Sequence, residues 1–596
     1  MAVELEARRA NEVTPEDELR VVRYVNALYE QAFRAKAEVW NRVRRWEKMW
    51  KGDQWSPNIP KWRTRAISNF IFAIIETQVT WLAESKPKII VDPLGPEDAE
   101  QAKNLEKIIV DYLWDELSIR SKIKRMIRSA LIRGRGFLKV GWDPWARSPF
   151  GRGEVSVEYV PWNEIFLDPL ATDYSKARYI IHARWMPRSE VARIWPDQGW
   201  RVMPGAGEVQ PDGSGMYLAD VDIAIGSGGY DGIGDGDRVL VKECWIKDDS
   251  VELHEEVNVD EHGETKTNQY YRLKYPNGRL IVVADNVVLF DGPSPYDAQR
   301  DEDIFPFVAM SAYEDDDSIW DLSEVSQLEW PQRVLNMIES RMVDYVRLVA
   351  NTPWIKDTNS GVKAEDLTNQ EGLVITKNPG SEVRRDPPPP LPTSLFQLYL
   401  QVQRNMETIS GVHDVTQGRR PTGIAAASAI AQLQEAGQAR IRDKARNRDD
   451  AILRLGRLMA LRIIEFYGPE RQIAIRGEGD QVQMVNFDIQ QLRMGVDVRI
   501  IPGTSLDMNE QLRYQAAREL LQLGALMPEH VLDVINFPNK EEIKAQLAQQ
   551  RAMAAAQQAA GGQGGQGQGQ LPPIGGPQER PLALRQWPMP GPPGGF

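Results

Sequence analysis

Apolar residues recur at helical spacing near the start of the chain and predict two helices. The first covers residues 15–50, and Arg and Lys crowd its second half. Its apolar positions are Val21, Val22, Tyr24, Val25, Leu28 and Tyr29. The second covers residues 66–85 and ends before Pro87. After a short strand-like run at 88–91, residues 97–133 predict one long helix or two shorter ones.

The middle of the chain changes to β-branched and aromatic runs between Gly, Pro and Asp turns, which predict strands. These runs cover 137–142, 154–160, 179–185, 238–247 and 270–290. Pro276-Asn277-Gly278 predicts a hairpin turn within the last run. Residues 199–236 are rich in Gly, Asp and Pro and predict an irregular insertion. The region up to residue 320 is therefore expected to be mixed α+β.

From residue 321 the pattern becomes mainly helical. Two amphipathic helices are predicted at 323–350 and 393–410, on either side of a small β-containing excursion at 352–385. The first helix has the apolar stripe Val334, Ile338, Met342, Tyr345 and Val349, opposite Arg333, Asn336, Ser340, Asp344 and Arg347. The second has the apolar stripe Leu395, Leu398, Val402, Met406 and Ile409, opposite Gln397, Gln401, Arg404 and Thr408.

A glycine-punctuated loop from Gly411 to Gly423 precedes a very long predicted helix at about 424–467. A short β segment at 471–502 and helices at about 507–526 and 528–558 follow. The tail from residue 559 is dominated by Gly, Gln and Pro, so it is expected to be disordered. The fold class predicted from the whole pattern is α+β, mainly helical.

Composition narrows the possible functions. The 596 residues carry a formal net charge of −13, which argues against a protein that coats nucleic acid tightly. The single cysteine, Cys244, excludes a disulfide within the chain and a multi-thiolate metal site. Five histidines leave little for a His-based metal centre. No stretch of about 20 apolar residues is present, so no membrane span is expected.

The search for catalytic motifs is negative. The chain contains no phosphate-binding P-loop, no H-E-x-x-H and no G-x-S-x-G. His254-Glu255-Glu256 lacks the second histidine of a zinc motif. Asp231, Asp235 and Asp237 lie in a Gly-rich segment, where a weak calcium loop is conceivable and a solvated loop is the simpler interpretation. We therefore expect no enzyme activity, no cofactor and no metal.

The paired amphipathic helices have two interpretations. One apolar stripe beside a small and almost neutral polar face suits the wall of a water-filled channel. The same pattern also suits an ordinary helical bundle with a solvent-exposed face. The pattern by itself favours the bundle.

An ordered set of short segments resembles the portal, or head-to-tail connector, proteins of tailed double-stranded-DNA bacteriophages, closest to the podovirus type. The resemblance covers about 50–505, and no single piece of it is a strong motif. The matching residues are Trp50–Trp55, Asn69, Lys86-Pro87, Gly134–Trp142, Pro161–Pro169, Gln332, Asn336, Ser410-Gly411-Val412, Gly418 and the long helix from Ile424.

The resemblance implies a ring, commonly of twelve subunits, around a central channel for double-stranded DNA. It maps 1–320 and 424–505 to a wing, 321–350 and 391–410 to stem helices, and 351–390 to a clip. It further maps 411–423 to a tunnel loop and 506–558 to a helical crown, before a disordered tail at 559–596.

The resemblance also implies partners and a location. The clip would bind the large terminase subunit and later the head-completion or tail adaptor, with Lys356 and Lys363 as candidate docking residues. Major capsid and scaffolding proteins are the other expected partners, and no membrane is. The protein would belong to the capsid vertex of the virion and assemble in the host cytoplasm.

A ring gives the net charge a different meaning. Twelve copies at −13 each would carry −156, so only isolated rings of basic residues would hold the passing DNA, and the duplex could slide. The predicted channel-lining residues are Gln397, Gln401, Arg404, Thr408, Arg419 and Arg420, and the predicted loop hinges are Gly411, Gly418, Pro421 and Gly423. Alternatively, Arg419 and Arg420 form ion pairs with a neighbouring subunit.

Two other classes of function remain open at the level of sequence. One is a metal-dependent enzyme that processes nucleic acid with the scattered acids, for which Asp231 and Asp235 are the residues to test. The other is an adaptor or scaffold that binds proteins only. Mixed charges at 440–450 in the long helix are expected to form ion pairs between subunits rather than to bind DNA.

Overall fold

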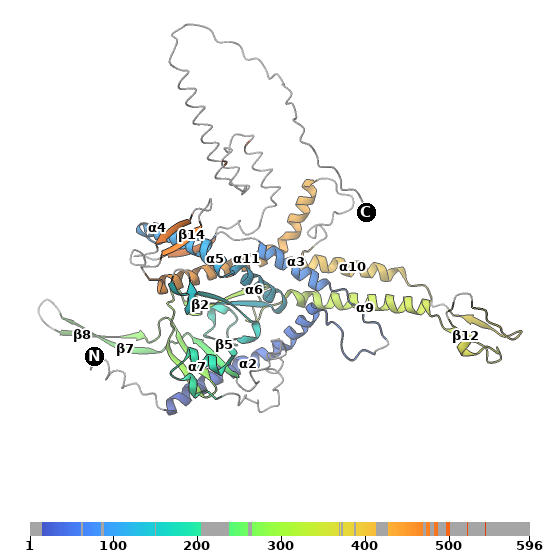
Figure 1. Cartoon of the computed structure of the whole chain (residues 1–596), viewed down its shortest axis with the longest axis horizontal. Helices are drawn as coiled ribbons and strands as arrows, with labels where there is room; N and C mark the ends of the chain where they lie inside the picture. Colours follow the sequence, from blue (N-terminus) through green and yellow to red (C-terminus); the bar gives the residue numbers. More distant parts are fainter. Residues whose placement is uncertain are drawn as a thin grey trace, which may run out of the picture. The chain divides into compact units, whose positions relative to one another are not determined.

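The computed structural model describes residues 15–60, 63–84, 89–148, 151–203, 238–259, 265–368, 370, 373–386, 389–412, 427–468, 472–476, 482–486, 496–500, 521 and 543. The chain divides into two compact units, one of residues 1–508 and a second of 509–596. The description below concerns the first unit, whose elements are labelled in Figure 1. The predictions for 413–426, for most of the insertion, for nearly all of the crown and for the tail lie outside the described residues.

Helix α2 (Pro15–Lys51) confirms the first predicted helix. Its buried residues follow a spacing of three and four: Val22, Val25, Tyr29, Ala32, Lys36, Val39, Val43, Trp46 and Met49. The first half of this stripe packs on a sheet with Ile181, Cys244 and Ile281, and the second half joins the larger core. One helix therefore connects both hydrophobic cores of the unit.

The next helices agree with the prediction in position, and for 97–133 the structure matches the alternative of two helical stretches. Helix α3 (Phe70–Glu84) lies within the predicted 66–85. The stretch 97–133 is divided into η1 (Pro96–Asp98), α4 (Ala99–Lys107), the π-helical η2 (Ile108–Leu113), α5 (Trp114–Glu116) and α6 (Ile119–Arg133). The main break is at Ser118, whose φ of 49° is left-handed and ends helical hydrogen bonding.

Two antiparallel sheets form the centre of the unit. A three-stranded sheet has the order β11-β2-β3 and a five-stranded sheet has the order β10-β9-β6-β5-β4. Their strands are β2 (Arg135–Ser148), β3 (Gly151–Val160), β4 (Ile165–Leu167), β5 (Tyr179–Pro187), β6 (Arg238–Ile246), β9 (Arg279–Ala284), β10 (Val287–Pro293) and β11 (Phe307–Ser311). The short helices are η3 (Trp162–Glu164), η4 (Tyr174–Lys176), α7 (Arg188–Ile194), η5 (Gly199–Arg201) and η7 (Asp301–Ile304).

The predicted hairpin at Pro276–Gly278 is wrong in one respect. A turn is present, with Gly278 at a φ of 84°, but it joins strands of different sheets. Strand β8 (Thr265–Leu273) pairs with β7 (Val251–Val259), whereas β9 pairs with β6 and β10. The β9–β10 hairpin turns instead at Asp285, which has a φ of 53°.

The helix pair predicted after residue 321 is confirmed. Helix α9 (Glu324–Ala350) begins at Ser323, whose side chain accepts a hydrogen bond from Ser326 N, and packs along α10 (Thr393–Ser410). Between them the chain forms β12 (Trp354–Lys356), η8 (Ala364–Asp366) and β13 (Val383–Arg385), with β12 and β13 paired. In Figure 1 this β unit lies at the end of the helix pair away from the sheets.

The long predicted helix is also confirmed, as α11 (Ala427–Phe466). It packs on β11 and on β16 (Val496–Ile500), which pairs with β1 (Ile89–Pro93). Strands β14 (Gln472–Arg476) and β15 (Val482–Asn486) form a further antiparallel pair. Helices and strands therefore both contribute, which confirms the α+β class. Among the described residues, no helix has the length and apolarity to span a bilayer.

Candidate functional site

Helix α10 presents the polar stripe predicted from the sequence. Gln397, Gln401, Arg404 and Thr408 are all exposed, and they lie at intervals of four, three and four residues on one face. The opposite side buries Val402, Met406 and Ser410. Tyr399 links the two helices, because its hydroxyl donates to Glu339 of α9 at 3.0 Å. The stripe thus carries a single charge, that of Arg404.

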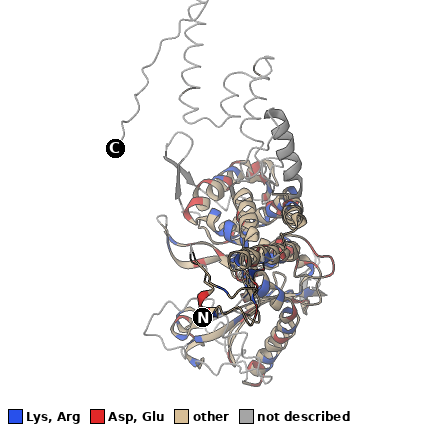
Figure 2. Ribbon diagram, turned by 90° about the vertical axis from the view of Figure 1, so that its right-hand side faces the viewer, with Lys and Arg blue, Asp and Glu red and all other residues tan. Residues whose placement is uncertain are grey.

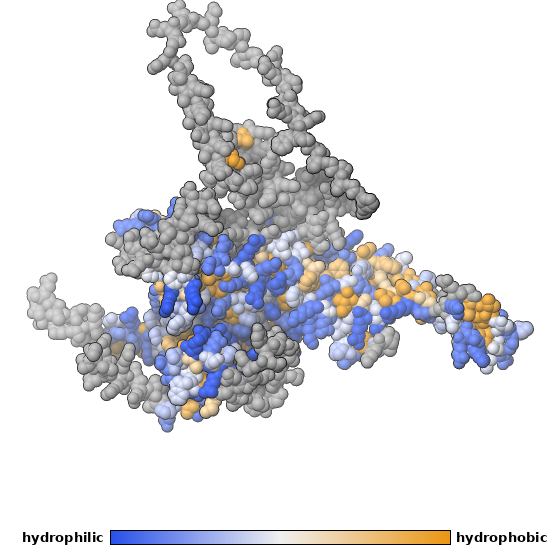
Figure 3. Space-filling view, in the orientation of Figure 1, coloured by the Kyte–Doolittle hydropathy of each residue, from blue (hydrophilic) through white to orange (hydrophobic). Residues whose placement is uncertain are grey.

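The predicted apolar stripes are only partly covered within the chain. Ile338 of α9 and Met406 of α10 are buried, whereas Leu398 is 44% exposed and Val349 is 47% exposed. Other exposed apolar side chains on the pair are Met337, Val343, Val346, Leu348, Phe396 and Leu400. Figure 3 shows apolar surface, in orange, along the helix pair. A large uncovered apolar surface is typical of a protein–protein contact.

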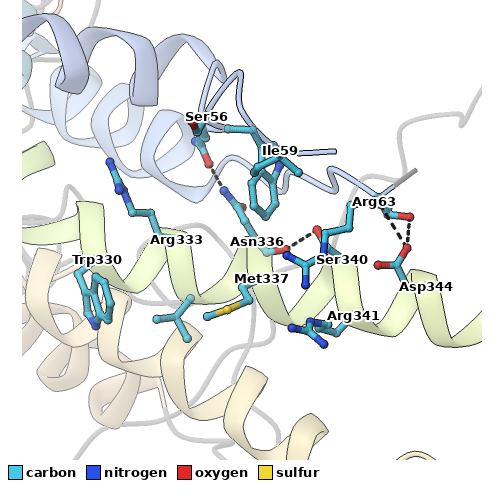
Figure 4. Close-up of a pocket in the computed structure, with 14 residues that line it drawn as sticks. Ser56, Ile59, Arg63, Trp330, Arg333, Asn336, Met337, Ser340, Arg341 and Asp344 are labelled. Carbon is cyan, nitrogen blue, oxygen red and sulfur yellow. Dashed lines mark hydrogen bonds between the residues drawn. The ribbon is translucent and has the colours of Figure 1, made fainter. Parts of the chain in front are cut away.

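The polar face predicted for α9 is not a free face around Asn336 and Ser340. Asn336 and Ser340, expected there, are 1% and 6% exposed because the segment following α2 lies over them. Ser340 Oγ accepts a hydrogen bond from Ala66 N at 3.1 Å and donates to Asn336 O at 2.7 Å. Asp344 accepts from both Thr64 N and Thr64 Oγ1 (Figure 4). Asn336 and Ser340 therefore contact the same chain and are not available to line a channel.

Next to Ser340, a network of hydrogen bonds between amide side chains joins α9 to the segment after α2 and to the start of α3. Asn336 Nδ2 donates to Gln54 Oε1 at 2.5 Å, and Gln54 Nε2 donates to Asn69 Oδ1 at 3.0 Å. Gln332 donates to Asn336 Oδ1 at 2.9 Å and accepts from Phe70 N at 3.1 Å, at the start of α3. Asn69 Oδ1 also accepts from Phe72 N at 3.1 Å, which satisfies a free amide of the first turn of α3.

This amide network brings together residues that the family resemblance singled out separately. Gln54 belongs to the Trp50–Trp55 segment, and Asn69, Gln332 and Asn336 are further residues of the resemblance. All of them meet at one point, where α2, α3 and α9 join. No signal in the sequence pairs positions that are 282 residues apart, such as Gln54 and Asn336.

A second buried cluster joins α11 to the base of the helix pair. Lys444 and Glu324 form an ion pair in which both side chains are 0% exposed. Gln78 of α3 donates to Glu324 Oε1 at 3.1 Å and to Ser410 O, at the end of α10, at 2.9 Å. Tyr313 donates to Glu324 Oε2 at 2.7 Å. The cluster fixes α3, α9, α10 and α11 to one another.

This cluster corrects the expectation for the charged middle of the long helix. Lys444 pairs within the chain, and so does Arg448, which binds Asp449 at 2.6 Å and donates to Leu82 O at 2.8 Å. Both cations are buried by the same chain rather than offered to a neighbouring subunit. The reason is that the helix crosses the core at this point, so charges at these positions need partners close by.

The predicted clip residues lie on the β unit between α9 and α10. Lys356 and Lys363 are both exposed, and the Lys356 ammonium donates to Val362 O at 2.7 Å. Gly411 ends α10 with a φ of 72°, the left-handed conformation usual after a helix. Gly418, Arg419, Arg420, Pro421 and Gly423 lie outside the described residues.

The residues weighed as catalytic or metal-binding candidates lie partly outside the described part of the chain. Within that part, no three His, Cys, Asp or Glu side chains are grouped as metal ligands would be, while Asp231, Asp235 and Asp237 lie outside it. Cys244 is completely buried, and burial raises the pKa of its thiol, which disfavours the reactive thiolate. His254 is paired with Glu252 at 2.9 Å.

The fold and site define a class of protein in which a long helix pair is anchored, by buried polar clusters, in a mixed α+β body. The model of the phage P22-like portal protein family matches residues 26–574. The chain therefore belongs to the P22-like portal family of bacteriophages and has a phage portal function, in a family that is structural rather than enzymatic. No curated protein sequence matches it.

Proposed function

We propose that the chain is one subunit of a ring at a single capsid vertex, through which double-stranded DNA enters during packaging and leaves during ejection. The family resemblance implies twelve copies in this ring. In this proposal α9 and α10 are the stem helices, and the β unit at 351–390 is the clip. The proposal is carried by one observation: the α9–α10 pair combines an exposed polar stripe with uncovered apolar side chains.

The polar stripe suits the lumen of such a ring. Gln397, Gln401 and Thr408 are neutral, and Arg404 adds one positive charge per subunit. A wall of this kind offers hydrogen bonds to water and few fixed contacts to phosphates. A duplex can then move along the wall, since strong binding would require many simultaneous phosphate contacts. Contacts to the backbone alone also tolerate every DNA sequence.

The uncovered apolar side chains support the assembly of several copies. Val346 is 64% exposed and Phe396 is 52% exposed, on two helices that otherwise pack on each other. Burial of such surface against a neighbouring copy is favourable by about 25 cal/mol per Å². The helix pair is therefore a strong candidate for contact between adjacent stems.

The clip is the proposed docking site for the large terminase subunit and then for the tail adaptor. Its exposed cations include Lys356 and Lys363, together with Arg384 and Arg385 on β13. The same range, 351–390, contains six acids, so the clip offers charges of both signs, which suit fast, reversible exchange of one partner for another. The tunnel loop at 411–423, the crown at 506–558 and assembly in the host cytoplasm complete the proposal.

The test has two parts. Negative-stain imaging of the purified chain should show rings with a central hole; a stable monomer under all assembly conditions would contradict the ring. In a packaging reaction, the combined change Arg404→Gln, Arg419→Gln and Arg420→Gln should lower the amount of packaged DNA while rings still form. An unchanged yield would indicate a protein-only adaptor instead of a DNA channel.

A further inference from the structure

A short part of the chain has a charge opposite to that of the whole. Residues 41–65 contain eight Lys or Arg and two acids, although the complete chain has a net charge of −13. The basic residues are Arg42, Arg44, Arg45, Lys48, Lys51, Lys61, Arg63 and Arg65. Helix α6 (Ile119–Arg133) is a second basic stretch, with six Lys or Arg and no acid. Over the ribbon as a whole, Figure 2 shows Lys and Arg in blue and Asp and Glu in red side by side. A local excess of one sign points to a partner of the other sign.

The structure places five of these cations, Arg44, Arg45, Lys48, Arg63 and Arg65, around two adjoining hollows. The larger, of about 680 Å³, lies between the end of α2 and the segment after it. Its basic lining residues are Arg44, Arg45, Lys48, Arg65 and Arg333, and Asp53 is the acid among its described lining residues. The smaller, of about 310 Å³, follows α9 and adds Arg63 and Arg341 (Figure 4). Both share Arg333, Gln54, Trp55 and Ser56, so they form one basic hollow.

Two carboxylates near this basic hollow, those of Glu329 and Asp344, are already bound by other groups. Glu329 binds two guanidinium groups at once, that of Arg45 at 3.0 Å and that of Arg333 at 2.7 Å. One carboxylate cannot neutralise two cations, so positive charge remains. Arg65 donates to the carbonyl oxygen of Ile59 at 2.7 Å, which leaves its charge uncompensated by that contact. Asp344 is bound by Thr64.

The basic hollow is also open to a large ligand. The side chains of Arg45 and Arg333 are 51% and 45% exposed despite their shared carboxylate. Trp330, which lines the smaller hollow, is 72% exposed and offers a flat apolar face beside the cations. A planar guanidinium matches the oxygens of a phosphate in two parallel hydrogen bonds, and an exposed indole can pack on a sugar.

We infer that the basic hollow between α2, residues 53–59 and 63–65, and α9 binds phosphate groups of the backbone of double-stranded DNA, at a site separate from the predicted channel-lining residues. The inference rests on the proposed function, which brings DNA to the protein. A regular polyanion is favoured over an acidic segment of a neighbouring copy, because seven cations line one continuous surface. Contacts to phosphates alone would carry no sequence preference.

The test measures the salt dependence of DNA binding by the full-length chain. A short duplex of random sequence is titrated between about 50 and 200 mM salt with wild type and with Lys48→Gln, Arg65→Gln and Arg341→Gln combined. Each lost phosphate contact should reduce the slope of log K against log salt by about 0.9, so a reduction of about 2.7 is expected. The matched control is Arg20→Gln, Arg23→Gln and Arg34→Gln, which removes equal charge from the exposed first half of α2.

The outcomes separate this inference from the proposed function. A flatter slope in the triple variant with rings intact, and an unchanged slope in the control, supports the basic hollow as a phosphate site. Equal slopes in all three proteins would overturn the inference and leave the ring proposal standing. Loss of rings with unchanged DNA binding would assign the basic hollow to subunit contact, which also overturns the inference. Absence of rings in wild type would count against the proposed function alone.

Discussion

At the scale of single residues, the chain places charged and polar groups in its core, and Lys36 is one whose hydrogen-bond partners are all close by. The Lys36 ammonium is almost fully buried and donates to Trp162 O at 2.7 Å, Asn163 O at 3.1 Å and Ile165 O at 2.6 Å. It also lies 4.3 Å from the ring centres of Trp162 and Phe166. Helical spacing assigns position 36 to the buried side of α2, but only the structure supplies its partners.

Replacement of Lys36 by Met should destabilise the chain by about 3 kcal/mol. The methyl-terminated side chain fills a similar volume but leaves three carbonyl oxygens at η3 without their donor, and buried unpaired acceptors are costly. Urea unfolding monitored by tryptophan fluorescence measures the change. Arg34→Met, at a side chain that is 81% exposed on the same helix, should stay within about 0.5 kcal/mol. Equal effects of the two changes would contradict the argument.

Tyr174 should make the stability of the fold sensitive to alkaline pH. Burial raises the pKa of its hydroxyl to about 12, and the hydroxyl donates to Phe307 O at 3.0 Å. The unfolded chain ionises at about pH 10, whereas the folded chain keeps this proton up to about pH 12, so stability falls across that window. The loss amounts to about 3 kcal/mol for two pH units.

The comparison that isolates this residue uses Tyr174→Phe. The variant should show a shallower decline of the free energy of unfolding between pH 10 and about 12 than wild type. Tyr271→Phe is the control, because that side chain is 74% exposed and meets water in the folded chain. A decline in Tyr174→Phe as steep as that of wild type would refute the assignment.

At the scale of elements, two buried polar clusters decide how the helices are joined. The amide network of Gln54, Asn69, Gln332 and Asn336 links the start of α3 to α9. The ion pair of Lys444 and Glu324 links α11 to the base of the same helix. A buried pair of this kind contributes little net stability compared with apolar packing, but it penalises any arrangement that separates its partners.

Removal of one partner of the ion pair should therefore lower the free energy of unfolding. Lys444→Met leaves the Glu324 carboxylate buried beside only Gln78 and Tyr313, and we expect a loss of about 3–5 kcal/mol. The double change Lys444→Met with Glu324→Leu should recover part of this loss, because no unpaired charge remains. Thermal and urea unfolding measure both. The control is Arg446→Met, at an exposed position of α11. If Lys444→Met alone were as stable as this control, the role assigned to the ion pair would be contradicted.

At the scale of the whole molecule, membership of the P22-like portal family is consistent with the apolar surface that the single chain leaves exposed. The α9–α10 pair exposes Val346, Leu348, Phe396 and Leu400. A soluble monomer rarely keeps such a surface uncovered. Assembly into a ring would bury it, which connects the amino-acid pattern of two helices to the proposed channel.

Charges placed in this surface should prevent assembly without unfolding the subunit. Val346→Asp with Leu398→Asp alters side chains that are 64% and 44% exposed, so the fold of the chain loses little. The same carboxylates would be buried in a contact between copies, at a large cost. Analytical ultracentrifugation and circular dichroism should show a folded monomer. Arg23→Asp, on the exposed side of α2, should still form rings; rings in the double variant would exclude this surface as the contact.

The predictability of the fold differs between local and distant features. Helices α2, α9, α10 and α11 follow from the spacing of apolar residues, because that spacing depends only on neighbours three and four positions away. The spacing of apolar residues did not specify where the helical stretch 97–133 is interrupted. The interruption depends on one residue in the left-handed conformation, Ser118. The exposed stripe of Gln397, Gln401, Arg404 and Thr408 was also predictable from spacing alone.

The sequence by itself determined the α+β class, the long helices, the excursion between α9 and α10 and the family to which the chain is similar. Tertiary structure decided which polar residues are buried and with which partners. Asn336 and Lys444 both occupy positions that read as solvent-facing, yet each is buried by a partner 282 or 120 residues away. The physical reason is that periodicity records one helix at a time, whereas burial depends on which other elements pack against it.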